Sequence, residues 1–168
     1  MSINYFSKAQ ELQGAKFRKQ VKSPLFNLFL LAKLPAAYFS GVRVLSLDEE
    51  ECKVKVPYKW FSQNPFKSTY FACLSMAAEM STGLPCLMAI DKMQPKISML
   101  VVGLEAQFTK KATDISTFGC KDVAAIYDCV ARAIESKEAS VVETFSMGYN
   151  KAGEEVARFK ITWSFKSK

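Results

Sequence analysis

Apolar residues follow strand-like patterns in several parts of the chain, either alternating with polar residues or forming short continuous runs. Two of these stretches lie on either side of the acidic turn Asp48-Glu49-Glu50, which predicts a β-hairpin. The last two lie on either side of Lys151-Ala152-Gly153 and predict a second hairpin. The expected strands cover residues 42–45, 52–56, 97–111, 114–120, 140–150 and 155–165.

Other stretches have the apolar spacing of helices, and we expect them over residues 5–20, 25–34, 68–82 and 123–136. Ser23-Pro24 is a typical helix start. Gly83 stands at an expected C-cap and Pro85 disfavours continuation, so the central helix is predicted to end at residue 82. The helix over 25–34 is expected to pack on the domain through one stripe, formed by Leu25, Leu28, Phe29 and Ala32.

The central helix determines the expected fold, because it is apolar on all sides and such a helix is buried. A long antiparallel sheet curled around it would bury it in this way. Strands that are mostly consecutive, with few helices between them, favour an α+β class with a mainly antiparallel sheet of about six strands.

Glu79 is the only charged residue between Thr69 and Thr82. A carboxylate on a buried helix should have a raised pKa, which suits a general acid or base. Alternatively, Glu79 faces solvent near the end of the helix. Composition alone does not separate these two interpretations.

Composition excludes several kinds of chemistry. The 168 residues include no histidine, which excludes Ser-His-Asp and Cys-His nucleophile systems and His-based zinc motifs. The five cysteines are odd in number and form no CxxC pair, so we predict reduced thiols, no disulfide framework and no metal site. No secretion signal is apparent at the N-terminus, and we expect a cytoplasmic protein.

The net charge of +7 is uneven, because residues 1–34 hold six basic groups and one acid, Glu11. This basic N-terminus predicts either a weak contact with a membrane surface or a docked helix with a solvated basic face. The apolar stretch 25–32 is too short to span a bilayer, which takes about 20 residues. No motif indicates nucleic-acid binding. We expect residues 1–22 to form a basic helix or tail and residues 23–168 to form one domain.

The sequence resembles a known protein family. The segment Asn64 to Gly83 resembles the central segment of hotdog-fold acyl-CoA thioesterases, in the phenylacetyl-CoA and 4-hydroxybenzoyl-CoA branch. Asn64, Tyr70-Phe71-Ala72 and Glu79 stand at the positions of that family's Asn, His-Gly-Gly and acid. FTKKATD from Phe108 and GEEVARFKITWSF from Gly153 resemble two further strand motifs. Over residues 24–166 the sequence is most similar to a little-characterised hotdog subfamily of unknown function.

The resemblance implies a hotdog fold with an extra N-terminal helix and a second helix before the last hairpin. It implies that Glu79 holds a water that attacks the thioester, while Asn64 orients water or substrate and the backbone amide of Phe71 binds the oxyanion. It further implies a homodimer or a dimer of dimers, and no cofactor apart from the coenzyme A of the substrate. The residues expected to bind substrate are Tyr70, Ser68, Lys110 and Lys111.

The chain also departs from the family motif, because Tyr70 replaces the His and Phe71 and Ala72 replace the two Gly. The Phe71 side chain would narrow an approach that Gly leaves open. Three functions therefore stay open from the sequence: an acyl-CoA thioesterase-like hydrolase, a non-catalytic hotdog protein that binds acyl groups or lipids, and a protein that interacts with membrane surfaces through its basic N-terminus.

Overall fold

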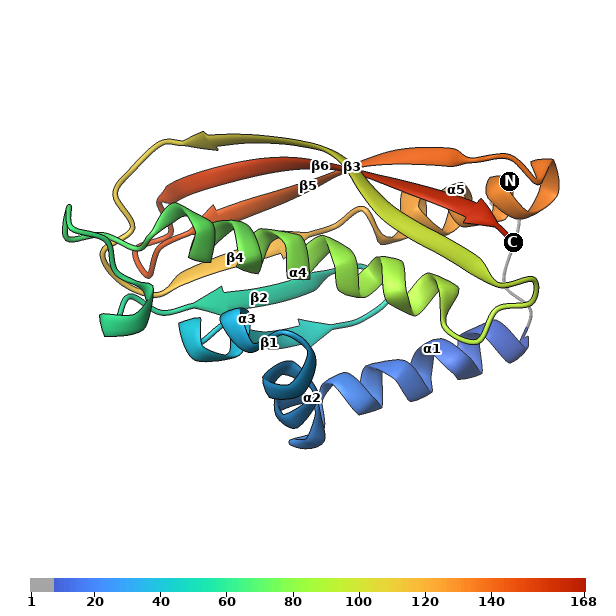
Figure 1. The fold of residues 1–168 in the computed structure, drawn as a ribbon, viewed down its shortest axis with the longest axis horizontal. Coiled ribbons are helices and arrows are strands. Elements are labelled where there is room, and N and C mark those ends of the chain that lie inside the picture. Colours follow the sequence, from blue (N-terminus) through green and yellow to red (C-terminus); the bar gives the residue numbers. More distant parts are fainter. Residues whose placement is uncertain (1–7) are drawn as a thin grey trace.

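The structure is a computed structural model that describes residues 8–168, with side chains described from residue 12 onward (Figure 1). The helix expected over 5–20 is present from residue 8, and its first three residues lie outside the described residues. The division at residue 22 stays a prediction.

Within residues 8–168, one six-stranded antiparallel sheet forms most of the fold, as the sequence predicts. Its strand order is β1-β2-β4-β5-β6-β3, so β1 and β3 are the edge strands. The two longest strands, β3 and β6, pair with each other over almost their full length. The strands are β1 (Arg43–Leu47), β2 (Cys52–Val56), β3 (Ile97–Phe108), β4 (Ser116–Cys120), β5 (Ser140–Tyr149) and β6 (Glu155–Ser167).

One long helix, α4, runs along the sheet, and shorter helices lie around it (Figure 1). The N-terminal helices α1 and α2 lie below α4 in this view, on the side away from β5 and β6. Helix α3 follows α2 after one residue and was not predicted separately. The helices are α1 (Lys8–Val21), α2 (Leu25–Lys33), α3 (Pro35–Ser40), the 3₁₀ turn η1 (Trp60–Ser62), α4 (Phe71–Ile90) and α5 (Val123–Ser136).

Helix α4 forms the centre of the core, as its apolar composition predicts. It contacts β1, β2, β4, β5 and β6, and most of its side chains are buried. Two hydrogen bonds attach it to the sheet: the Trp163 indole N–H donates to the Thr82 hydroxyl at 3.1 Å, and the Ser81 and Ser146 hydroxyls are 2.7 Å apart. Although α4 is long and apolar enough to cross a membrane, its burial identifies it as a core helix.

The predicted end of the central helix is wrong, because α4 continues through Gly83 and Pro85 to Ile90. Both residues are buried within the helix, where packing outweighs their low helix propensity. Gly83 has a packing role: a Cβ atom at this position would lie 3.3 Å from the Trp163 ring. The glycine therefore allows close contact between helix and sheet instead of ending the helix.

The predicted packing of α2 is also wrong. The stripe of Leu25, Leu28, Phe29 and Ala32 is exposed, and only Leu30 of this helix is fully buried. The helix is apolar on more than one face, so its spacing does not indicate which face turns inward. As a result, an apolar helix face remains uncovered.

Candidate functional site

Asn64 holds the loop that leads into α4. Its side-chain oxygen accepts hydrogen bonds from the backbone N–H groups of Phe66 (3.0 Å) and Ser68 (3.2 Å). Its amide nitrogen donates to the Ser68 hydroxyl at 3.1 Å. Asn supports such local turns because its short side chain reaches the backbone a few residues on. The Asn64 side chain is therefore engaged in fixing residues 64–69 immediately before the helix.

The N-terminus of α4 presents free backbone donors. Tyr70 is the N-cap residue, with φ −61° and ψ 132°, and its side chain makes no capping hydrogen bond. Its carbonyl accepts from the N–H groups of Cys73 and Leu74. Within residues 8–168, the Phe71 and Ala72 N–H groups have no hydrogen-bond partner. Free amides and the helix dipole together favour negative charge at this point.

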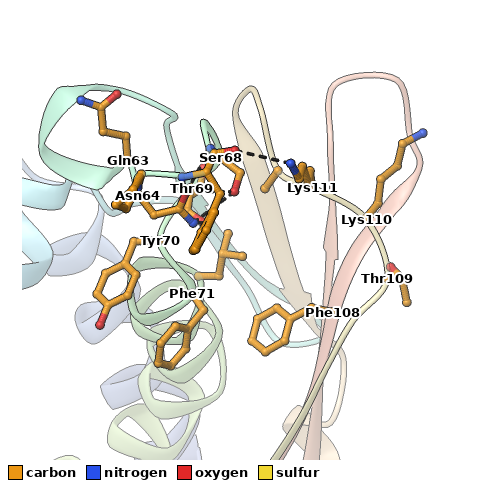
Figure 2. Close-up of a pocket in the computed structure, with 14 residues that line it drawn as sticks. Gln63, Asn64, Ser68, Thr69, Tyr70, Phe71, Phe108, Thr109, Lys110 and Lys111 are labelled. Atoms are coloured by element: carbon orange, nitrogen blue, oxygen red, sulfur yellow. Dashed lines mark hydrogen bonds between the residues drawn. The ribbon is translucent and has the colours of Figure 1, made fainter.

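A cavity of about 770 Å³ lies at this helix end. It is bordered by the Asn64 loop, the first turn of α4 and the end of β3 with its following residues (Figure 2). Its aromatic wall consists of Tyr70, Phe71 and Phe108, whose rings contact one another edge to face at centroid distances of 5.0 and 6.2 Å. The cavity combines apolar surface with free amides, which suits an apolar ligand that carries one polar acceptor.

Polar side chains at the cavity come mainly from the loop before α4. Ser68 and Thr69 line it and are both buried. The Thr69 hydroxyl has no hydrogen-bond partner among the described residues, which is costly for a buried group unless a ligand or water meets it.

Two lysines lie beside the cavity and differ in their surroundings. Lys110 forms an ion pair with Glu154, and its side chain points away from the cavity in Figure 2. The Lys111 ammonium donates to the Phe66 carbonyl at 3.5 Å, which keeps this positive charge near the Asn64 loop.

Glu79 lies two turns further along α4 and does not line the cavity. The residue is exposed on the isolated chain, yet one of its carboxyl oxygens lies 3.1 Å from where a Cβ of Gly83 would stand, beside the Trp163 ring. Loss of water around the carboxyl group raises the pKa of Glu79. Within the described part of the chain, its carboxylate has no hydrogen-bond or ion-pair partner.

The structure thus brings together most of the residues that the sequence singled out. Asn64, Ser68, Tyr70, Phe71 and both lysines border one cavity, whereas Glu79 stands apart from it. The sequence did not lead us to assign Phe108 to the site, although it begins the FTKKATD motif, and Thr69 was not among the predicted site residues.

Neither thiols nor metal ligands offer an alternative centre in the described residues. All five cysteines are free and buried, and burial raises the pKa of the Cys120 thiol to about 12, which keeps it protonated. No group of three or more His, Cys, Asp or Glu side chains that could hold a metal ion occurs there.

The family model described as "Domain of unknown function (DUF4442)" matches residues 23–165. No curated protein matches this chain.

Several solved structures share the fold at low sequence identity. A Pseudomonas aeruginosa protein of unknown function, described as a probable thioesterase, is 19% identical, with a TM-score of 0.73 over 87% of this chain and 97% of that chain. A protein of unknown function from Chlorobaculum tepidum is 13% identical, with a TM-score of 0.72 over 95% and 97%. A Haemophilus influenzae thioesterase is 13% identical, with a TM-score of 0.61 over 87% and 92%. These matches confirm the expected hotdog fold.

Proposed function

The chain belongs to the DUF4442 family and has the hotdog fold of known and probable thioesterases, and we propose that it hydrolyses acyl thioesters at the α4 cavity. The observation that carries this proposal is the pair of unpartnered N–H groups, Phe71 and Ala72, at the N-terminus of α4 beside an apolar cavity. Amides in this arrangement stabilise an oxyanion that develops on a bound carbonyl.

The proposed reaction needs a water and a base. The water oxygen attacks the thioester carbonyl carbon, and the carbonyl oxygen becomes an oxyanion that accepts from the Phe71 N–H. The carboxylate of Glu79 takes a proton from the water. The C–S bond then breaks, and this proton passes to the sulfur, so the products are a carboxylic acid and a thiol. A raised pKa suits Glu79 to this role, because a base near the working pH both accepts and returns a proton.

One chain does not place both groups at one carbonyl. Glu79 follows Phe71 by eight residues, a rise of about 12 Å along the helix axis. An oxyanion donor and a base must both lie within about 3 Å of the reacting groups. We therefore place the base of each site on a second copy of the chain, with Glu79 of one copy facing the Phe71 amide of the other.

The edge strand β3 supports such an assembly. Its apolar residues Leu100, Val102 and Leu104 are exposed, and within the described chain it pairs on one side only, with β6. A long apolar edge strand is stabilised by pairing with another strand. A homodimer joined near β3 covers this strand, and a dimer of dimers contains the same contact.

Asn64 and the lysines have supporting roles in this proposal. Asn64 acts as a positioning residue, because its hydrogen bonds fix the loop that sets the start of α4. Lys111 meets the phosphates of coenzyme A at the cavity, and Lys110 adds positive charge once it leaves Glu154. Tyr70 and Ser68 contact the acyl or pantetheine part. Coenzyme A enters only as part of the substrate.

A second function is favoured by one observation. Phe71 occupies the position where a glycine leaves the approach open, and its ring lies between those of Tyr70 and Phe108 (Figure 2). A chain with this ring across the site could retain an acyl group without cleaving it. Co-purification of a fatty acid without turnover of any thioester would support this binding function.

The test compares two substitutions of Phe71 on a panel of aliphatic and aromatic acyl-CoA thioesters. Phe71→Pro removes the N–H, and the backbone accepts proline because this is the first helical position and Tyr70 is extended. Phe71→Gly removes the ring and keeps the N–H. We expect turnover to fall by about 10²–10³-fold in Phe71→Pro, the effect of losing an oxyanion donor, and to stay or rise in Phe71→Gly.

Glu79→Gln is the companion variant, and Glu135→Gln, an exposed glutamate on α5, is its control. We expect a loss of at least about 10²-fold for the first and no change for the second. Equal activity of Phe71→Pro and wild type, or of Glu79→Gln and wild type, would show that the proposed mechanism is wrong.

A further inference from the structure

The uncovered side of α2 continues into a larger apolar surface. Helix α3 contacts both α2 and η1, and the Phe39 ring on α3 lies 5.7 Å from that of Phe61 on η1. Trp60 beside it is 80% exposed. We call this surface the α2–η1 face, and its exposed apolar residues include Leu25, Leu28, Phe29, Leu34, Phe39 and Trp60.

The charge around this face has one sign. The charged residues of the segments that form it are all basic, because residues 23–41 hold Lys33 and residues 57–62 hold Lys59, with no acidic residue in either segment. Lys33 ends α2 and Lys59 directly precedes Trp60; both are exposed, and neither forms an ion pair within the described residues.

The structure also leaves space beneath the face. An apolar cleft of about 330 Å³ lies between α1, α2 and the C-terminal half of α4. Leu25 and Phe29 at its border are exposed, so the cleft opens where the apolar face begins. Such a cleft accepts the end of a hydrocarbon chain without displacing the core.

We propose that the α2–η1 face docks on the surface of an anionic lipid bilayer. Short helices with exposed Leu and Phe, flanked by Lys, insert their apolar side at the boundary between headgroups and acyl chains. Tryptophan favours the same depth, and lysines are attracted to anionic headgroups. This surface is separate from the α4 cavity, so the proposal does not depend on the proposed hydrolysis.

Charge distinguishes a bilayer from a second copy of the chain. A two-fold contact brings the same patch of both copies together, which would set Lys33 and Lys59 against like charges, and residues 23–41 and 57–62 contain no acid to pair with them. An anionic bilayer supplies the opposite charge and the apolar phase together.

The test measures binding of the full chain to vesicles of phosphatidylcholine with and without phosphatidylglycerol. We expect binding to the anionic vesicles only, weakened at about 0.5 M salt because screening shortens the reach of the lysines. Trp60 provides a local signal, since Trp163 is buried. Its emission should shift to shorter wavelength on binding, and Trp60→Phe should remove this shift.

Two matched double variants locate the surface. Leu28→Ser with Phe29→Ser changes two residues that are 59% and 46% exposed, and Val141→Ser with Phe145→Ser changes two on β5 that are 57% and 49% exposed. We expect the first pair to lower vesicle binding at least about ten-fold and the second to leave it unchanged. All four positions are exposed, so both variants should keep the wild-type circular dichroism spectrum and melting temperature.

Three results would overturn the proposal. The first is equal binding by both double variants, and the second is absence of binding to anionic vesicles or equal binding to neutral ones. The third is a lipid-free assembly that only Leu28→Ser with Phe29→Ser dissociates, which would assign the α2–η1 face to a second copy of the chain.

Discussion

Two surfaces of this protein expose apolar side chains to a similar extent, and their charges differ. On β3, Leu104 is 53% exposed, and its neighbour Glu105 forms an ion pair with Lys160 of β6. On the α2–η1 face, Leu28 is 59% exposed, and the charged residues of the segments that form the face are Lys33 and Lys59. The β3 surface also has an open strand edge with both donors and acceptors, whereas the α2–η1 face is formed by helices and contains no strand edge.

This difference teaches that apolar area alone does not identify a partner. A surface with both charges and an open strand edge is complementary to itself, so a second copy fits it. A surface with only positive charge repels a second copy and suits an anionic layer. The predictions below test whether this distinction holds.

The largest effect is expected from a charge placed on β3. Leu104→Lys should weaken self-association at least about thirty-fold, because it puts like charges into the centre of the proposed contact. Thioester hydrolysis should fall with it. Leu28→Lys, a similarly exposed position on the other face, should leave the assembly intact. Light scattering at micromolar concentration measures the assembly of the wild type and of both variants. A wild type that is monomeric would contradict the proposed dimer.

A second prediction concerns stability and pH. The raised pKa of Glu79 means that the folded chain binds this proton more tightly than the unfolded chain does. Its ionisation therefore lowers stability as pH rises from the ordinary value of 4.5 through the raised folded-state value. Glu79→Gln has no ionisable group at this position, so it does not lose stability in this way as pH rises.

We expect Glu79→Gln to have a higher free energy of unfolding than wild type at neutral pH, with the two converging below the ordinary pKa. Denaturant unfolding at several pH values measures the difference. A difference that stays constant with pH would show that desolvation of this carboxylate is not its cause.

The smallest effects are expected from substitution of two glycines, Gly83 on α4 and Gly14 on α1. Gly83→Ala should lower the free energy of unfolding by about 1 kcal/mol, because the new Cβ would press on the buried Trp163 ring. Gly14→Ala on α1 should raise it by about 0.5–1 kcal/mol, since its nearest contact would be an ordinary 3.4 Å and alanine favours helix. A change of the same sign in the free energy of unfolding of both variants would contradict this difference between the surroundings of the two glycines.

The order of the helices and strands could be predicted because each of them depends on the local spacing of apolar residues. Helix α5 matches its predicted bounds, and the hairpin of β1 and β2 forms around the acidic turn. The end of α4 could not be predicted, because Gly83 and Pro85 are local helix breakers and only the contact with Trp163 shows why the helix tolerates them. The face of α2 that turns inward depends on the neighbouring surface that covers Leu30. The spacing of apolar residues within α2 carries no information about that surface.

The candidate site shows the same limit. Sequence motifs indicated the start of α4 and the residues after β3, and the structure places them around one cavity. The spacing of Phe71 and Glu79 on one helix already implies a separation of about two turns, but the family resemblance assigned both groups to one reaction without saying which copy of the chain supplies each. That separation follows from helix geometry, and it is the reason why the proposed site takes its base from a second copy.

The central claim, a site shared between two copies, is tested most directly by mixing two inactive variants. Phe71→Pro retains Glu79 and lacks the amide donor, and Glu79→Gln retains the donor and lacks the base. If the site is shared, each mixed dimer has one intact site, and random exchange of copies restores about a quarter of wild-type turnover. If one chain supplied both groups, every site would lack one of them, and the mixture would stay as inactive as its components.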